Sequence, residues 1–156
     1  MRPSEATNLV AEFREKFLFS RMGPMIDDFA APLPVFHGGK VHVLQTPDDV
    51  HDVMADLRDV AGTMGMADFR GEILSAHTIQ GGALCLSVDW TFEGLPQCGQ
   101  RVLPVTYWIG SDLCRPSIRM VEIRRSRRGR AARNRMPLRL TPHREVRDPP
   151  LLWTTL

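Results

Sequence analysis

Four stretches with the residue pattern of β-strands follow one another between residues 69 and 123, and only short turns separate them. In the clearest of them, apolar side chains alternate with small or polar ones. The apolar set is Leu84, Leu86, Val88, Trp90 and Phe92, and the other set is Cys85, Ser87, Asp89 and Thr91. Because neighbouring side chains of a strand point to opposite faces, one face belongs to the core and the other is polar. The sequence therefore predicts an antiparallel meander with strands at 69–79, 83–92, 101–109 and 117–123.

Three helices are predicted before the meander. The signal is strongest at 46–65, where apolar residues recur at the three- and four-residue spacing of one helix face. Thr46 is suited to cap this helix and Gly65 to end it. Apolar residues at similar spacing indicate an earlier helix around 9–17 and a short one around 22–29. Each of these helices has one apolar face, which packing against a sheet would bury.

A short hairpin is predicted between the second and third helices. Strand-like residues at 33–36 and 41–44 flank Gly38 and Gly39, and paired glycines suit the positive φ angles of a tight turn. Two helices, a hairpin, a third helix and a meander make an α+β fold, with the N-terminal helices packed on one face of an antiparallel sheet. We expect its core to contain Phe13, Phe17, Val53, Leu57, Val60, Leu84, Leu86, Val88 and Trp90.

Four short runs carry a resemblance to a known superfamily. They are DDF at 27–29, PVFH at 34–37, TPDD at 46–49 and VDW at 88–90. With these runs in this order, residues 8–123 resemble the nuclear transport factor 2-like superfamily, with its SnoaL-like and cystatin-like proteins. The resemblance implies a cone-shaped half-barrel, in which the helices pack on the concave face of a strongly curved antiparallel sheet. It also implies a pocket inside the cone and a homodimer.

The function that the resemblance implies is set by the pocket. Members of the superfamily isomerise steroids, dehydrate substrates, open epoxides, cyclise polyketides or carry out no reaction, and the fold does not choose among them. We expect a cone that binds a small, mostly apolar molecule, with isomerase, dehydratase or polyketide-cyclase-like chemistry as one outcome. The alternative is a non-enzymatic homodimeric binding or interaction module. No cofactor is expected, and the expected pocket-lining residues are Phe13, Phe17, Phe29, Leu57, Leu86 and Trp90.

Tyr107 and His77 are two candidates for catalysis, because an acid or base inside an apolar cone has a shifted pKa. Tyr107 is the only tyrosine and lies on the apolar face of its predicted strand. Its hydroxyl is either a proton donor in the pocket or a core group with its hydrogen bond satisfied. His77 shares a predicted face with Phe69 and Ile73, so it either enters the pocket or is a hydrogen-bonded core or rim residue.

The third candidate is Asp27, in the short second helix. At most one of Asp27 and Asp28 can face inward beside the apolar residues of that helix, and the alternative is a solvated role for both. Asp89 resembles a catalytic base because it is a carboxylate in the middle of a strand. Alternation places it opposite the apolar side chains, so we expect it at the solvent or homodimer surface.

The histidines and cysteines do not predict a metal site. His37 and His42 would be diagonal neighbours on one face of the hairpin, but no third ligand has a recognisable spacing to them. Cys85, Cys98 and Cys114 are odd in number and match no metal-ligand spacing or disulfide framework. We therefore expect no metal.

The C-terminal part differs sharply in charge. Residues 1–123 contain 10 basic and 16 acidic residues, whereas residues 124–156 contain 10 and 2. We place the domain boundary there, with 1–123 as the folded domain and 124–156 as an Arg- and Pro-rich extension without its own core. We expect its only apolar anchor at 151–153. Its arginines predict weak binding to nucleic acid or an anionic surface, and the alternative is a solvated or partner-binding tail.

The chain length and the N-terminal residues indicate how many domains to expect and where in the cell the protein lies. A chain of 156 residues with 43% hydrophobic residues fits one domain with a substantial core. Charged residues interrupt the N-terminus, and no apolar run is long enough for a membrane span. We therefore expect a cytoplasmic protein.

Overall fold

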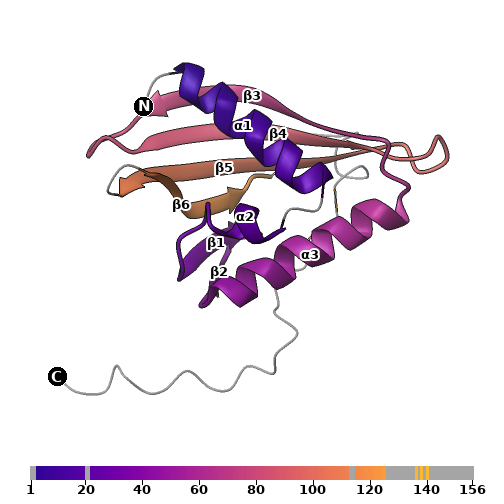
Figure 1. Cartoon of the computed structure of the whole chain (residues 1–156), viewed down its shortest axis with the longest axis horizontal. Helices are drawn as coiled ribbons and strands as arrows, with labels where there is room; N and C mark the ends of the chain where they lie inside the picture. Colours follow the sequence, from indigo (N-terminus) through magenta and orange to yellow (C-terminus); the bar gives the residue numbers. More distant parts are fainter. Residues whose placement is uncertain are drawn as a thin grey trace.

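The computed structural model describes residues 3–19, 22–112 and 115–125, together with positions 136, 138 and 140. Figure 1 shows the elements in chain order. They are α1 (Pro3–Leu18), α2 (Met22–Ile26), β1 (Leu33–His37), β2 (Lys40–Leu44), α3 (Pro47–Thr63), β3 (Asp68–Thr78), β4 (Leu84–Glu93), β5 (Gln100–Asp112) and β6 (Arg115–Ile123). The predicted order of helices, hairpin and meander is confirmed, and the predicted boundaries differ by three residues or fewer except at α1, which begins at Pro3 rather than near residue 9.

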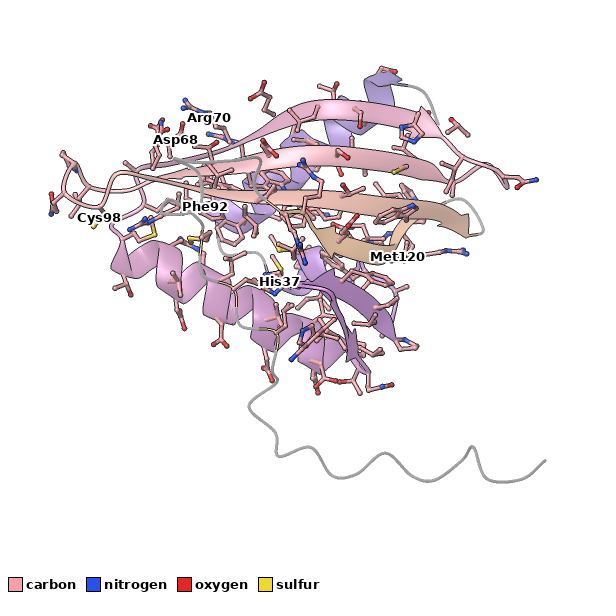
Figure 2. The ribbon with its side chains drawn as sticks, turned by 180° about the vertical axis from the view of Figure 1, so that it is seen from behind. His37, Asp68, Arg70, Phe92, Cys98 and Met120 are labelled. Atoms are coloured by element: carbon pink, nitrogen blue, oxygen red, sulfur yellow. The ribbon has the colours of Figure 1, made fainter. Side chains whose placement is uncertain are left out.

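The strands form one sheet in the order β2-β1-β6-β5-β4-β3. Neighbouring strands are antiparallel except β1 and β6, which run parallel. α1 lies across one face of the sheet in Figure 1, and Figure 2, seen from behind, shows the sheet in front of that helix. α3 contacts α2 and β2. This is the predicted α+β arrangement, with helices on one face of a mostly antiparallel sheet. None of the described helices is both long and apolar enough to cross a membrane.

The N-terminus of α3 is held by the predicted cap. The Thr46 hydroxyl accepts a hydrogen bond from the Asp49 backbone N–H at 3.2 Å, and the Asp49 carboxylate accepts one from the Thr46 backbone N–H at 3.1 Å. These bonds satisfy N–H groups that have no partner within the helix. The apolar face of α3 is then free to enter the core, where it buries Val50, Val53, Met54, Leu57 and Ala61.

α1 is attached to the edge strand β3 through Arg14. Its guanidinium donates to the Asp68 carboxylate at 3.0 Å and to the backbone carbonyl of Phe69. The hydrogen bond from Arg14 lowers the pKa of Asp68, because it stabilises the charged carboxylate. This contact links α1 to the edge of the sheet.

The alternation in β4 is confirmed. Its five apolar residues, Leu84, Leu86, Val88, Trp90 and Phe92, are all buried on the face toward the helices. Of the wider predicted core, Phe17, Val53 and Leu57 are buried as well, whereas Phe13 and Val60 are half-buried and pack against it. The opposite face of the sheet, which we call the outer face, carries Ser87 hydrogen-bonded to Thr106 at 2.9 Å.

The predicted face of His77 is wrong, because β3 contains a β-bulge. Ile73 pairs with Val88, but Ser75 pairs with Ser87, so Leu74 is an extra residue on β3. One extra residue reverses the faces of every side chain beyond it. His77 therefore pairs with Cys85 and is exposed on the outer face.

Beyond the end of β6, residues of the C-terminal segment form hydrogen bonds with the same edge of β5. The Arg124 backbone N–H donates to the Pro104 carbonyl at 2.9 Å, and Pro104 has no N–H to continue the ladder. The Met136 backbone N–H donates to the Val102 carbonyl at 3.1 Å. Val102 lies two residues nearer the start of β5 than Pro104. The segment therefore lies against the sheet at this point.

Three apolar residues of this segment join the core, which corrects the expectation of a single anchor at 151–153. Met136 and Leu140 are buried, and Leu138 is half-buried against them. The spacing of two residues is that of an extended chain with one face inward. Residues 126–135 and 151–153 lie outside the described part of the chain, so the nucleic-acid and anionic-surface binding stays a prediction.

Candidate functional site

A cavity of about 560 Å³ lies between α1 and the sheet. Its walls are mainly apolar and include Leu9, Phe13, Leu86, Trp90, Ile109 and Ile118. Its charged lining residues are Glu5, Glu12, Lys16, Asp28 and Arg115. Since Glu5, Glu12 and Arg115 are exposed, the charged residues mark the solvent side of the cavity.

A smaller hollow of about 60 Å³ adjoins this cavity and is lined by apolar residues and Tyr107. The two spaces share Phe13, Trp90 and Tyr107 as a common wall. The residues predicted to line a pocket are divided between them. Phe13, Leu86 and Trp90 line the larger cavity, whereas Phe17, Phe29 and Leu57 line the smaller hollow.

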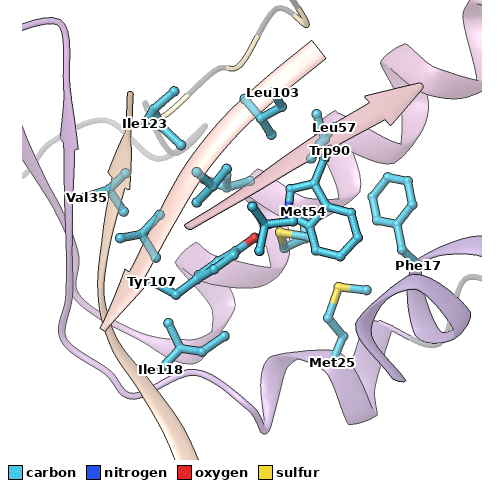
Figure 3. Packing of buried hydrophobic residues seen from close by; sticks show 14 of the residues in the cluster. Phe17, Met25, Val35, Met54, Leu57, Trp90, Leu103, Tyr107, Ile118 and Ile123 are labelled. Carbon is cyan, nitrogen blue, oxygen red and sulfur yellow. Dashed lines mark hydrogen bonds between the residues drawn. The ribbon is translucent and has the colours of Figure 1, made fainter. Parts of the chain in front are cut away.

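Tyr107 lies in the middle of β5 between Leu86 of β4 and Val121 of β6, and it points toward the helices. It is 7% exposed. The Trp90 indole N–H donates to its hydroxyl oxygen at 2.7 Å, and Figure 3 shows the hydroxyl beside the indole among apolar side chains. Burial raises the pKa of Tyr107, and the hydrogen bond from Trp90 offsets only part of that effect. The hydroxyl is therefore protonated at neutral pH.

Aromatic rings hold the Trp90 indole in place. The Phe69 ring stacks on it with centroids 4.8 Å apart and an interplanar angle of 15°, and the Phe13 ring lies 5.2 Å from it. Trp90 is 2% exposed. Because its neighbours restrict the indole ring, the direction from which its N–H reaches Tyr107 is fixed as well.

Asp28, rather than the predicted Asp27, lines the cavity. Its carboxylate accepts from the Lys16 ammonium at 2.6 Å and lies 3.5 Å from the Arg115 guanidinium. The Asp28 backbone carbonyl also accepts from the Ile118 N–H at 2.8 Å, which joins this loop to β6. Asp27 is exposed and is not a lining residue, so the structure does not place it where it could act on a ligand.

The remaining sequence candidates lie away from the cavity. His77 is exposed on the outer face. Asp89 is also on that face, in an ion pair with Arg124 at 2.5 Å. Cys85 is buried there, and burial raises the pKa of its thiol, which disfavours the nucleophilic thiolate.

The hairpin pairing places His37 and His42 diagonally, as predicted, because His37 pairs with Lys40 and His42 with Val35. Within the described residues, no three His, Cys, Asp or Glu side chains are close enough to bind one metal ion.

The sequence interpretation missed Lys16, Arg115 and Ile109 as residues of the site. Lys16 lies three residues after Phe13 on α1, so helical spacing was a usable signal for it. Ile109 is two residues after Tyr107 on the same strand face. Arg115 had no comparable signal, since it reaches the cavity from the start of β6 only through the folded arrangement.

Comparison with known proteins identifies the fold and no specific function. No protein-family model matches the chain, and no curated protein matches it. Among solved structures, an NTF-2 like protein of unknown function from Shewanella oneidensis matches with a TM-score of 0.59 and 12% identity, over 78% of this chain and 98% of that one. The protein Aln2 from a Streptomyces species also matches with a TM-score of 0.59, at 18% identity, over 80% and 93%.

A putative scytalone dehydratase from Novosphingobium aromaticivorans matches with a TM-score of 0.55 and 8% identity, over 78% of this chain and 82% of that one. A putative SnoaL-like polyketide cyclase from Shewanella putrefaciens matches with a TM-score of 0.51 and 9% identity, over 78% and 89%. At these identities the likeness concerns the backbone alone. The chain has the nuclear transport factor 2-like fold, which the SnoaL-like and cystatin-like proteins share.

Proposed function

We propose that the protein binds a small, mostly apolar molecule in the cavity between α1 and the sheet. The observation that carries this proposal is an unfilled space of about 560 Å³ with apolar walls, a buried hydroxyl and charged residues on its solvent side. Ligand pockets have volumes of roughly 300–1,000 Å³ and the same combination of apolar walls with a few polar groups. A domain that serves only for association can have its interior filled by side chains.

An isomerase, dehydratase or cyclase-like reaction is the enzymatic form of this proposal. Two of the structural neighbours are named as a putative dehydratase and a putative polyketide cyclase. Such reactions need a proton donor and a base near the ligand. Tyr107 is the buried donor among the lining residues, and the carboxylates that line the cavity belong to Glu5, Glu12 and Asp28. The base of such a reaction would come from these three carboxylates.

The binding proposal predicts that a bulky side chain in the cavity weakens binding. Leu9 lines the cavity from α1, so Leu9→Trp should reduce the affinity for the neutral fluorescent probe N-phenyl-1-naphthylamine by about tenfold or more. Ala11 is exposed on the same helix and does not line the cavity, so Ala11→Trp is the matched control and should bind like the wild type. Equal binding by both variants would show that the probe binds elsewhere.

We also propose that the outer face packs against a second copy of the chain. The β1–β2 hairpin exposes three apolar side chains on this face, with Phe36 38%, Val41 54% and Val43 44% exposed. Phe36 pairs with Val41 across the hairpin and with Glu122 of β6, so the apolar row continues the outer face of the meander. Covering such a row in a symmetric contact removes it from water.

If this contact forms, Phe36→Lys should shift the protein toward monomer, because it places a charge in the apolar row. Light scattering over a range of protein concentrations measures the mass of each species. Leu95→Lys is the matched control, since Leu95 is 47% exposed in the turn between β4 and β5 and lies outside this row. A wild-type protein that stays monomeric at high micromolar concentration would contradict the proposal.

A further inference from the structure

The smaller hollow is closed on one side by the C-terminal segment. Leu138 and Leu140 line it, and neither of them lines the larger cavity. The charged residues on the solvent side of the larger cavity, in turn, do not line the hollow. Phe13, Trp90 and Tyr107 belong to both spaces. The solvent opening and the C-terminal segment therefore lie on different sides of this shared wall.

The hollow is too small to hold a whole ligand, but it is suited to the end of one. Its volume of about 60 Å³ holds about two groups the size of a water molecule or a methylene, at roughly 30 Å³ each. Its lining consists of apolar residues and Tyr107. Methylene groups are stabilised when they leave water for such surroundings. A short alkyl end is therefore the chemical group that fits the hollow.

Phe13 is the residue of the shared wall that can open it. Trp90 and Tyr107 are buried and hydrogen-bonded to each other at 2.7 Å, so both rings are held. Phe13 is half-buried on α1, and its side chain has no polar atom that a hydrogen bond could hold. A change of its rotamer therefore joins the two spaces without breaking a hydrogen bond.

We infer that the C-terminal segment sets the length of the ligand, because Leu138 and Leu140 form the far end of a binding space that continues past Phe13. The ligand is then a molecule with an apolar body in the larger cavity and a short alkyl end in the hollow. The inference rests on the proposed binding function and names the class of ligand for that cavity. The segment lies outside residues 8–123, so this end wall is an addition to the part of the chain that resembles the superfamily.

The test uses 4-alkylphenols with unbranched chains from ethyl to octyl, measured by displacement of N-phenyl-1-naphthylamine from the full chain. Each methylene that enters apolar surroundings should raise the affinity about fourfold. In the wild type this increase should stop at the chain length at which the terminal methyl group reaches Leu140. An affinity that rises by the same factor over the whole series would contradict the inference, because no wall would then limit the chain.

Two substitutions of Leu140 should move this limit in opposite directions. Leu140→Ala removes the branched end of the side chain from the wall, so the limit should lie about two or three carbons further along the series. Leu140→Phe adds atoms that the hollow has room for, so the limit should move to chains about one or two carbons shorter. The shortest phenols should bind all three proteins alike. The same limit in all three would overturn the role of the segment.

Met136→Ala is the matched control. Met136 is 4% exposed in the same segment, close to the 6% of Leu140, but it lines neither the hollow nor the cavity. Its replacement should therefore destabilise the protein by a similar amount without changing the limit on chain length. If Met136→Ala moves the limit as Leu140→Ala does, loosening of the segment explains the effect, and the assignment of the wall is wrong.

The outcomes separate this inference from the proposed function. If no alkylphenol displaces the fluorescent probe from the wild type, the proposed function itself fails and this inference fails with it. If short chains bind but the limit is absent or the same in every variant, the cavity stands and the inference alone fails. The wild-type series and Leu140→Phe decide the question even if Leu140→Ala folds poorly, and circular dichroism checks the folding of each variant.

Discussion

Replacing Trp90 by alanine is expected to lower the free energy of unfolding by about 3–5 kcal/mol. The indole is 2% exposed and lies between the rings of Phe69 and Phe13. Its removal leaves a void beside both rings, which lose their contacts with the indole. Since domains of this size are stable by about 5–15 kcal/mol, the variant should unfold at a much lower urea concentration.

Trp108 provides the matched control for this change. It lies on the neighbouring strand β5 but on the outer face, where it pairs with Cys85 and Met120 and is half-buried. Trp108→Ala should therefore lower the free energy of unfolding by less, about 1–2 kcal/mol. Urea unfolding at several protein concentrations separates any effect of association. Equal losses in the two variants would contradict the assignment of the two faces of the sheet.

Local signals in the sequence were sufficient to predict most of the fold. The alternation in β4 identifies its core face because each inward position is apolar without exception. The N-terminal boundary of α3 follows from Thr46 and Asp49, whose side chains bond to backbone groups only a few residues away. Such features depend on neighbours in the chain, so they can be predicted before any tertiary contact is known.

The bulge in β3 could not be predicted in this way. The sequence around it contains no turn residue, and although the apolar neighbours Ile73 and Leu74 break the alternation, they do not show which residue is the extra one. The extra residue is defined by the pairing with β4, which is a contact between strands. The error for His77 therefore arose from a tertiary feature, even though the strand itself was predicted correctly.

The candidate site also combines features that the local sequence predicts with features that only tertiary contacts determine. The inward direction of Tyr107 follows from the apolar residues on alternate positions of its strand. Its bond to Trp90 depends on the register between β4 and β5, in which Leu86 is the residue opposite Tyr107 and Trp90 is four positions further along β4. No local pattern specifies that register, and none specifies the space left between α1 and the sheet.

The expectation of a single apolar anchor at 151–153 was wrong because the charge of the C-terminal segment concealed a usable pattern. Met136, Leu138 and Leu140 recur at every second position, which indicates an extended segment with one apolar face. The arginines and prolines around them favoured a solvated tail. In the structure Met136 and Leu140 are buried and Leu138 is half-buried, and the Met136 backbone N–H donates to Val102 of β5.

Truncation after Arg125 is therefore expected to destabilise the domain by about 4 kcal/mol or more. It removes Met136 and Leu140, which are 4% and 6% exposed, and each buried side chain of this size contributes about 2–5 kcal/mol. It also removes Leu138 and Leu140 from the wall of the smaller hollow, which Leu103 and Val35 line as well. The melting temperature should fall accordingly, and apolar surface at the hollow should become accessible to solvent.

A second truncation, after Leu140, isolates the contribution of the described contacts. The difference in unfolding free energy between the two shortened proteins measures what residues 126–140 add, whatever the residues after them contribute. Leu140→Ala in the full chain should reproduce about 2–5 kcal/mol of that difference. If both truncated proteins unfold at the same urea concentration, the contacts of Met136 and Leu140 with the core do not stabilise the domain. The boundary of the folded domain would then lie near residue 123, as predicted, because the sheet and helices alone would account for the free energy of unfolding.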